Sequence, residues 1–412
     1  MNWKEVKTLE LLALKCLLKL FNNLDKVEDE EITYLEDFRH YLRVTNRQKF
    51  VRNRKIGRKL TKYQWWLLTE NEDSTSLEFG DFSPEDLSKV SKSEKNFKFA
   101  ESLTFNATDS NSESVQNVLK KASFIKKLQI EGKIEDELLG ETIALNCPNL
   151  KKLKLNKFED LTDDGLIDFI EDSKSKIEEL DIAYYSDNAQ GISFKSICKL
   201  DKMKSLRKFC VSVKQLKYFS LVPENYTNEN ITFLKLKFDY LKPDCLENLT
   251  FIEKIFPRVK KLHVTQIVFG LRSMSHFQSK IWKHSVTEFK SDEMNFNLIH
   301  KLTQDSFPNI KVLKFDWDRD IYLWDPPEIW QNNIEYLIIS NQYENQMNDN
   351  LIRQIIHKFS NLKKCKIRLE KRWTSEHDDG KKAVKNFKIP VILQYCRRLY
   401  EEDSISSSSD EE

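Results

Sequence analysis

A six-residue pattern, apolar-x-x-apolar-x-apolar, recurs along most of the 412-residue chain and constrains its fold more than any other feature. Numbered by the fourth residue, the copies are centred at residues 77, 103, 128, 153, 180, 209, 234, 262, 289, 313, 337 and 365, with spacings of 24 to 29 residues. Clear copies are "IKKLQI" (125–130), "LKKLKL" (150–155), "IEELDI" (177–182), "LRKFCV" (206–211), "ITFLKL" (231–236), "VKKLHV" (259–264), "IKVLKF" (310–315), "IEYLII" (334–339) and "LKKCKI" (362–367). A fixed period of this length predicts a solenoid that stacks one strand per repeat.

Helical patterns separate the predicted strands. "LTDDGLIDFIEDSKSK" (161–176) places its apolar residues on one face, and Asp163 and Asp164 stand at its start, where the helix dipole favours carboxylates. "NDNLIRQIIHKFSN" (348–361) repeats this arrangement. The chain therefore alternates strands and helices.

Over residues 70–372, about twelve repeats in all, the sequence resembles the leucine-rich repeat, in the subclass with units near 26 residues and a "TDxGL" helix start. The resemblance implies an α/β fold: a horseshoe solenoid with a parallel concave sheet and convex helices, in which stacked neighbours build one core. The ninth repeat position, usually Asn or Cys in the family, departs from the pattern. It holds Lys133, Phe158, Tyr185 and Lys214.

Three further segments flank the repeats. Residues 1–65 are predicted to form a small N-terminal helical region. Because a solenoid exposes apolar ends, residues 373–400 are predicted to cap its C-terminal end. The last stretch, "EEDSISSSSDEE" (401–412), is predicted to be a disordered acidic tail.

The concave face is the first candidate binding site. Counted from the first apolar residue, positions 3, 5 and 7 of each repeat should point to this face, because strand residues alternate sides. Of these 36 positions, twelve are basic and seven are acidic, so a groove for an acidic protein segment is one interpretation and a merely solvated sheet is the other. The acidic tail could itself occupy such a groove. The basic candidates are Lys152, Lys154, Lys208, Lys235, Lys237, Lys261, Lys364, Lys366 and Arg368.

The second candidate is an aromatic cluster within "FDWDRDIYLWDPPEIW" (315–330). Trp317, Tyr322, Trp324 and Trp330 are predicted to lie in a loop between two repeats. Such side chains are enriched at binding hot spots, although packing of the loop on its own aromatics would explain them equally well.

Nothing in the sequence indicates an enzyme, a cofactor or a metal site. The chain has eight glycines and none of the glycine-rich loops that hold phosphates, and its seven histidines and seven cysteines form no ligand-like spacing. A net charge of +2 and a basic run (47–62) without interleaved aromatics make nucleic acid an unlikely partner. No stretch is apolar enough to span a membrane. Scattered cysteines without a secretory signal predict a cytoplasmic or nuclear protein.

The opening helix, "TLELLALKCLLKLFNNL" (8–24), carries a leucine ridge that would serve either as a cap or as a docking surface. Thr8, Leu9, Ala13 and Leu17, with Leu20 following, resemble an elongin-BC box, in which a hydroxyl residue and Leu are followed at helical spacing by Cys or Ala and an aliphatic residue. The arrangement looks like the start of Zyg-eleven-type substrate receptors. The resemblance implies recruitment of elongin B/C and a cullin–RING ubiquitin ligase, with the repeats selecting the protein substrate.

Two alternatives stay open for this helix. The candidate cullin box, "ITYLEDFRHYL" (32–42), lacks the usual Leu-Pro pair, and "LALKCLLKLFNNLD" (12–25) also resembles the first helix of an F-box, which would bind a Skp-type adaptor. The other class is a non-enzymatic repeat scaffold or inhibitor, unrelated to ubiquitin, whose first helix is only a cap.

Overall fold

The structure is a computed structural model of the chain, and it divides into two compact units, unit 1 (residues 1–206) and unit 2 (residues 207–412), which we describe separately. The described residues are 75–92, 97, 99–108, 111–156, 161–173, 176–182, 192–212, 223, 225–237, 245–265, 279–294, 299, 302–317, 333–341, 356–357, 359–371, 381–384 and 389–397.

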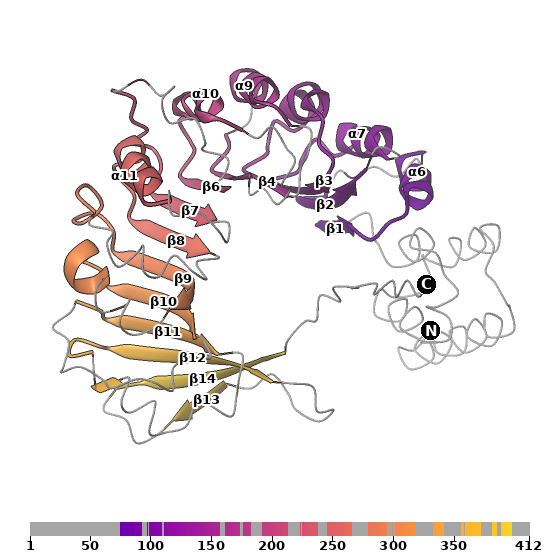
Figure 1. Cartoon of the computed structure of the whole chain (residues 1–412). Coiled ribbons are helices and arrows are strands. Elements are labelled where there is room, and N and C mark those ends of the chain that lie inside the picture. The colour runs from indigo at the N-terminus through magenta and orange to yellow at the C-terminus, as the bar shows by residue number, and fades with distance from the viewer. Residues whose placement is uncertain are drawn as a thin grey trace, which may run out of the picture. The chain divides into compact units, whose positions relative to one another are not determined.

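Unit 1 alternates parallel strands with helices on one side of the sheet (Figure 1). Its strands follow chain order, β1 to β5, and all neighbours are parallel. The elements are β1 (Ser76–Phe79), α6 (Pro84–Lys92), β2 (Ser102–Ala107), α7 (Ser112–Lys120), β3 (Lys127–Gly132), the π-helical η1 (Leu138–Ile143), α8 (Ala144–Asn146), β4 (Lys152–Asn156), α9 (Asp163–Asp172), β5 (Glu179–Ile182), α10 (Phe194–Ile197) and the 3₁₀ turn η2 (Leu200–Lys202).

Unit 2 continues the same architecture. Strands β6 to β12 lie in chain order, β14 pairs in parallel with β12, and β13 pairs antiparallel with β14. Both β13 and β14 fall in the segment predicted as a cap. The elements are β6 (Lys208–Ser212), β7 (Phe233–Lys237), α11 (Cys245–Ile255), β8 (Lys261–Thr265), β9 (Glu288–Met294), the π-helical η5 (Leu302–Ser306), β10 (Val312–Trp317), β11 (Tyr336–Asn341), β12 (Lys364–Lys371), β13 (Lys381–Val384) and β14 (Val391–Arg397).

Each of the twelve predicted pattern centres lies in a strand, from Leu77 in β1 to Cys365 in β12. Between neighbouring repeat strands within each unit, fourth position faces fourth position: Leu128 pairs with Leu153, for example, and Leu313 pairs with Leu337. The repeats nevertheless differ in length, so the extra residues of longer repeats are accommodated outside the strands.

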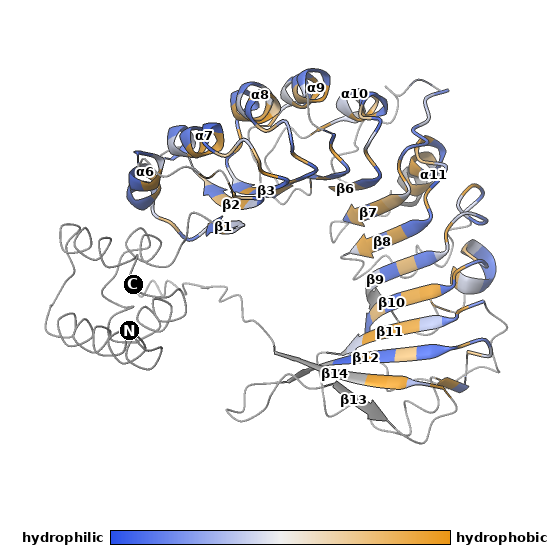
Figure 2. Cartoon of the chain, turned by 180° about the vertical axis from the view of Figure 1, so that it is seen from behind, coloured by the Kyte–Doolittle hydropathy of each residue, from blue (hydrophilic) through white to orange (hydrophobic). Residues whose placement is uncertain are grey.

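The core lies between the sheet and its helices. Positions 4 and 6 of the strands are buried, as Leu153 and Leu155 show, and helix α9 buries Leu166, Phe169 and Ile170. The same helices are hydrophilic on their outer side (Figure 2). These features confirm the predicted α/β fold, and within each unit the alternation of parallel strands and helices is that of a leucine-rich-repeat solenoid.

Helix α9 begins where the sequence predicted. Thr162 is its N-cap, and its hydroxyl oxygen accepts a hydrogen bond from the Gly165 N–H at 3.3 Å. Asp136 of the preceding repeat accepts two more hydrogen bonds, from the Thr162 N–H (2.9 Å) and hydroxyl (2.6 Å). Asp163 binds Ser193 and Ser196 of the next repeat in a similar way. The helix starts therefore tie successive repeats together.

A second set of hydrogen bonds also connects successive repeats, in place of the asparagine that is absent from the ninth position. In three repeats an asparagine directly before the strand pattern donates its side-chain amide to a backbone carbonyl of the previous repeat. Asn149 reaches Ser123 (3.2 Å), Asn309 reaches His284 (3.3 Å) and Asn333 reaches Pro308 (2.9 Å). Amide groups thus bridge these repeats at the start of the strand rather than after its end.

Candidate protein-binding surface

The candidate site is the open face of the sheet, which is the face opposite the helices and corresponds to the predicted concave side. Its residues occupy strand positions 3, 5 and 7, and these are exposed or half-buried in strands such as β4 and β7. At β6 this face is not accessible to a ligand, because Cys210 and Ser212, at positions 5 and 7, are buried. The open face of unit 2 therefore begins at β7, with Lys208 at its rim.

Basic and acidic residues balance on the open face of unit 1. Three described positions are basic and four are acidic. Lys152 of β4 is paired with Glu179 of β5 at 3.1 Å, and the Lys154 ammonium lies 3.5 Å from the side-chain oxygen of Gln129. The two predicted lysines of this unit thus lie on the predicted face but in a surface without a charge excess.

The open face of unit 2 is strongly basic. Among its described side chains at positions 3, 5 and 7, nine are basic and two, Glu288 and Asp316, are acidic. The positive excess of the whole-chain count therefore comes from this unit alone. The nine are Lys208, Lys235, Lys237, Lys261, Lys290, Lys314, Lys364, Lys366 and Arg368.

Glu288 neutralises the middle of this surface. Its carboxylate lies 3.0 Å from the Lys261 ammonium on β8 and forms a short ion pair with Lys314 on β10. Burial by itself would raise the pKa of Glu288, but the hydrogen bonds from Lys314 and Lys261 outweigh it and lower the pKa below its usual value. The carboxylate is therefore firmly ionised at neutral pH, and it holds two lysines.

Three other cations are available for a ligand. Within the described part of the chain, Lys235 on β7 and Lys364 and Arg368 on β12 have no ion-pair partner, and the two residues on β12 are exposed. Lys208 instead lies over the Phe233 ring, 4.9 Å from its centroid. An acidic ligand would therefore find its strongest electrostatic attraction at β7 and β12.

An apolar patch interrupts the cations on β11. Tyr336 is 43% exposed, and Ile338 at position 5 is half-buried on the same face. In the sheet register Tyr336 faces Lys364, and Ile338 lies between Lys314 and Lys366. Figure 2 shows the same contrast between the hydrophobic strands β10 and β11 and the more hydrophilic β12. The surface combines positive charge with an apolar contact, as binding hot spots do.

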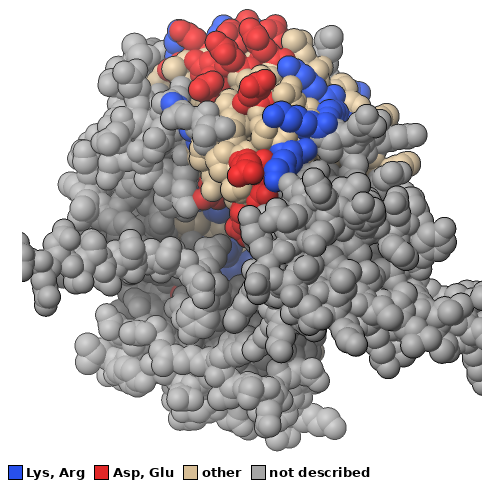
Figure 3. All heavy atoms as spheres, turned by 90° about the vertical axis from the view of Figure 1, so that its right-hand side faces the viewer, with Lys and Arg blue, Asp and Glu red and all other residues tan. Residues whose placement is uncertain are grey.

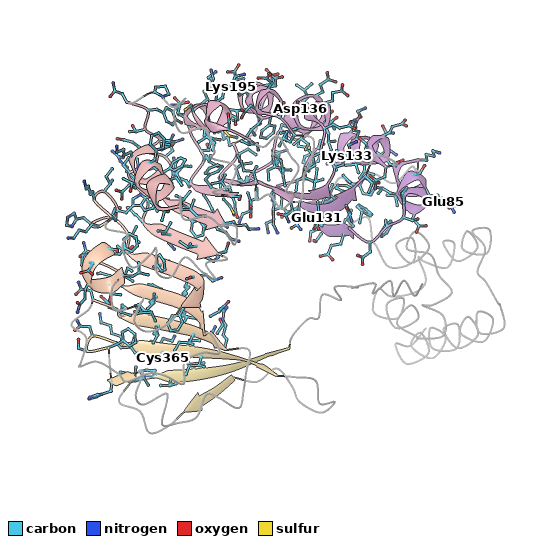
Figure 4. The ribbon with its side chains drawn as sticks, in the orientation of Figure 1. Glu85, Glu131, Lys133, Asp136, Lys195 and Cys365 are labelled. Atoms are coloured by element: carbon cyan, nitrogen blue, oxygen red, sulfur yellow. The ribbon has the colours of Figure 1, made fainter. Side chains whose placement is uncertain are left out.

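The helix side of unit 1 carries the opposite charge. Acidic side chains gather at the top of Figure 3, where these helices lie. Part of this charge is paired, because Lys195 of α10 lies 2.6 Å from Asp164, and Lys202 forms a short ion pair with Glu171. Figure 4 shows Asp136 and Lys195 on this helix side. Exposed members of the acidic group are Glu137, Glu141, Asp164, Asp168, Glu171 and Asp172.

The comparisons with known proteins identify no family. No family model matches the sequence, and no curated protein matches it. Among solved structures, a chain of the "Crystal structure of Rad7 and Elc1 complex in yeast" is similar at 14% sequence identity and a TM-score of 0.36. The similarity covers 88% of this chain and 90% of that chain.

Most of the other predicted site residues lie outside the described residues. This holds for the adaptor-binding candidates Thr8, Leu9, Ala13, Leu17 and Leu20, and for Tyr322, Trp324 and Trp330 of the aromatic cluster. The predicted loop position of Trp317 was wrong, whereas its role as an aromatic contact stays a prediction. Trp317 is the last residue of β10 and pairs in register with Met294 of β9.

Sequence reasoning missed the apolar patch of Tyr336 and Ile338. A signal for it was present, because "IEYLII" (334–339) carries apolar residues at both positions 3 and 5, whereas every other repeat of unit 2 carries a charged residue at one or both of them. The patch was not predicted because the residues at these positions were compared by charge and not by hydrophobicity.

The described residues also contain no candidate metal site. Within them no group of three or more His, Cys, Asp and Glu side chains could hold a metal ion. None of the described helices combines the length and the apolar character that crossing a membrane requires. Burial raises the pKa of the Cys147 and Cys365 thiols to about 12, so both are unreactive at neutral pH.

Proposed function

We propose that this chain is a non-enzymatic adaptor that binds an acidic segment of a partner protein on the open face of unit 2. The observation that carries this proposal is the nine-to-two excess of basic over acidic described side chains on the face that contains the exposed Tyr336. Electrostatic complementarity of this kind guides association and selects the partner, while a desolvated aromatic contact supplies affinity.

The test uses purified full-length chain and a fluorescent peptide of alternating Glu and Leu, with binding followed by anisotropy. The variant Lys364→Glu/Arg368→Glu reverses two exposed cations of unit 2. We expect it to weaken binding by about tenfold or more, because each reversal replaces attraction by repulsion. A peptide of Lys and Leu should not bind the unaltered chain.

A matched control comes from unit 1. Lys127→Glu/Lys154→Glu makes the same charge change on an open face without a positive excess, and it should alter binding by less than about twofold. Equal loss of binding in both variants would mean that only total charge matters and would overturn the proposed site.

We further propose that residues 8–20 recruit elongin B/C, so that the adaptor delivers its bound protein to a cullin–RING ubiquitin ligase. The spacing of Thr8, Leu9, Ala13 and Leu17 supports this role, since these residues would form one ridge on a helix. Purified elongin B/C should be captured by the full chain, and capture should be lost in Leu9→Ala/Leu17→Ala. Glu10→Ala, a change between the ridge residues, should retain it.

Two outcomes separate the alternatives for this helix. Capture of a purified Skp-type adaptor in place of elongin B/C would establish the F-box interpretation. Capture of neither, with a lower thermal midpoint for Leu9→Ala/Leu17→Ala, would leave a repeat scaffold or inhibitor whose first helix is a cap.

A further inference from the structure

We infer that the acidic C-terminal segment of this chain, residues 401–412, binds the basic open face of unit 2 and competes there with the acidic partner. This inference rests on the proposed function, because it assigns a second ligand to the same surface. Three observations support it: the opposite charges of the segment and the surface, the length of the chain beyond β14, and the apolar patch on β11.

The charges of the segment and the surface are complementary. "EEDSISSSSDEE" contains six acidic residues and no basic residue, whereas the open face of unit 2 has nine basic and two acidic described side chains. Lys235, Lys364 and Arg368 have no ion-pair partner within the described part of the chain, so they can receive carboxylates without breaking an existing pair.

The segment can reach every one of these cations. It follows β14, whose last residue, Arg397, lies in the same sheet as the basic strands. The fifteen residues from 398 to 412 span about 50 Å when extended. From β14 to β7 there are six strand spacings, or about 29 Å at about 4.8 Å each. The chain beyond β14 is therefore long enough to cross the whole basic face.

The single apolar residue of the segment has an exposed apolar contact available on the surface, because Tyr336 is 43% exposed. Ile405 lies between Asp403 and a run of serines, and the β11 patch of Tyr336 and Ile338 lies between the lysines of β10 and β12. An isoleucine with acidic residues on its N-terminal side can thus contact Tyr336 while its carboxylates approach Lys364 and Lys366.

Covalent attachment gives the segment an advantage over a free ligand. A ligand joined by a short flexible linker experiences an effective concentration in the millimolar range. A contact that is weak between separate molecules therefore suffices to occupy the face. The partner must displace the segment, so its apparent affinity is lowered.

The test compares the full chain with a chain shortened to residues 1–400. The probe is a fluorescent peptide with the sequence of residues 399–412, and its binding is measured by anisotropy. We expect the peptide to bind the shortened chain, to bind the full chain about tenfold more weakly because the attached copy competes, and to dissociate as salt is raised.

Variants show where the peptide binds. In the shortened chain, Lys364→Glu/Arg368→Glu should lower peptide affinity by about tenfold, and the unit 1 control Lys127→Glu/Lys154→Glu should leave it within about twofold. A peptide with Ile405→Ser should bind several-fold more weakly if Ile405 contacts the β11 patch.

The outcomes separate this inference from the proposed function. If the peptide binds both chains equally or neither, while the Glu-Leu peptide still depends on Lys364 and Arg368, the inference is overturned and the partner-binding face stands. If neither acidic peptide depends on these two residues, both the inference and the proposed face are wrong.

Discussion

Glu288 is the one acidic residue at position 3 among the described strands of unit 2, and it decides how much positive charge its surroundings display. It lies between Lys261 and Lys314 and binds both. Those two cations are therefore engaged within the sheet, whereas Lys364 and Arg368 have no ion-pair partner among the described residues. At the scale of single residues, the surface thus has two groups of cations: lysines that are ion-paired with a carboxylate, and cations that are available to bind a ligand.

Replacing Glu288 by Gln should make stability less dependent on pH. The pKa of Glu288 is lowered in the folded chain, so its ionised form stabilises the fold above the usual carboxyl pKa, and this contribution is lost as the pH falls through the lowered value. We expect Glu288→Gln to cost about 0.5–1 kcal/mol at pH 7, since the pair is partly exposed. The difference should be smaller at about pH 3, below the usual carboxyl pKa, than at pH 7.

Urea unfolding of both proteins at the two pH values measures this difference. Glu78→Gln, a change of an exposed carboxylate on the open face of β1, serves as the control and should change little at either pH. An equal destabilisation by Glu288→Gln at pH 7 and at low pH would contradict the assignment, because a packing defect does not titrate.

At the scale of elements, helix α9 depends on its contact with the preceding repeat. Gly165 in its first turn lies under the Asp136 carboxylate, and a Cβ atom at Gly165 would come within 2.0 Å of the Asp136 side-chain oxygen. The same carboxylate accepts the two hydrogen bonds of Thr162. The start of α9 and the start of the helical segment in the preceding repeat are thus fitted to each other.

Gly165→Ala should therefore destabilise the chain by about 1–3 kcal/mol, because the new methyl group displaces Asp136. Asp136→Ala alone should cost about 1–2 kcal/mol through the lost hydrogen bonds. Combined, the two changes should cost less than the sum of their separate effects, because removing the carboxylate removes the contacts at 2.0 and 2.2 Å and leaves only the contact with the Asp136 Cβ at 2.5 Å. Urea denaturation of the three variants measures the coupling.

Gly140→Ala is the matched control for this cycle. Its Cβ would lie 3.8 Å from the Asp168 Cβ, an ordinary contact, and alanine is the better helix former. It should leave stability unchanged or raise it. Strict additivity of Gly165→Ala and Asp136→Ala would refute the proposed contact.

The elements also show what the sequence could and could not predict. The strand centres and the start of α9 were predicted correctly because both depend on local patterns, namely alternating apolar residues and a capping threonine followed by carboxylates. The bridges from Asn149, Asn309 and Asn333 were not predicted, since each depends on which carbonyl the neighbouring repeat presents. The excess of basic residues was predicted only as a sum over all twelve repeats. Its restriction to unit 2 follows from the boundary between the two compact units, which the sequence alone does not reveal.

At the scale of the whole molecule, buried thiols report on the two units separately. Cys147 follows α8 in unit 1. Cys365 lies in β12 of unit 2, where Figure 4 labels it. Both are buried, and their pKa values of about 12 keep them protonated at pH 8. Repeats contact mainly their neighbours, so each thiol becomes reactive when its own part of the array opens.

We expect iodoacetamide to leave Cys147 and Cys365 unmodified in the native chain at pH 8 and to modify each one in urea. Mass spectrometry of the digested chain measures both sites. Cys198 serves as the comparison because it is only half-buried, with a pKa raised to about 11, and it should react first. Rapid modification of Cys147 or Cys365 in the native chain would show that the thiol is accessible and would contradict its burial in that unit.

The constant strand register has a consequence for how such a chain can change over time. Because each fourth-position residue meets its counterpart whatever the length of the intervening segment, as Leu262 meets Phe289 and Leu313 meets Leu337, residues gained or lost beyond the strands do not shift the columns of the open face. The helix side is thus free to diversify by insertion and deletion, and the recognition surface diversifies by substitution. The two sides of one repeat can evolve by different kinds of mutation.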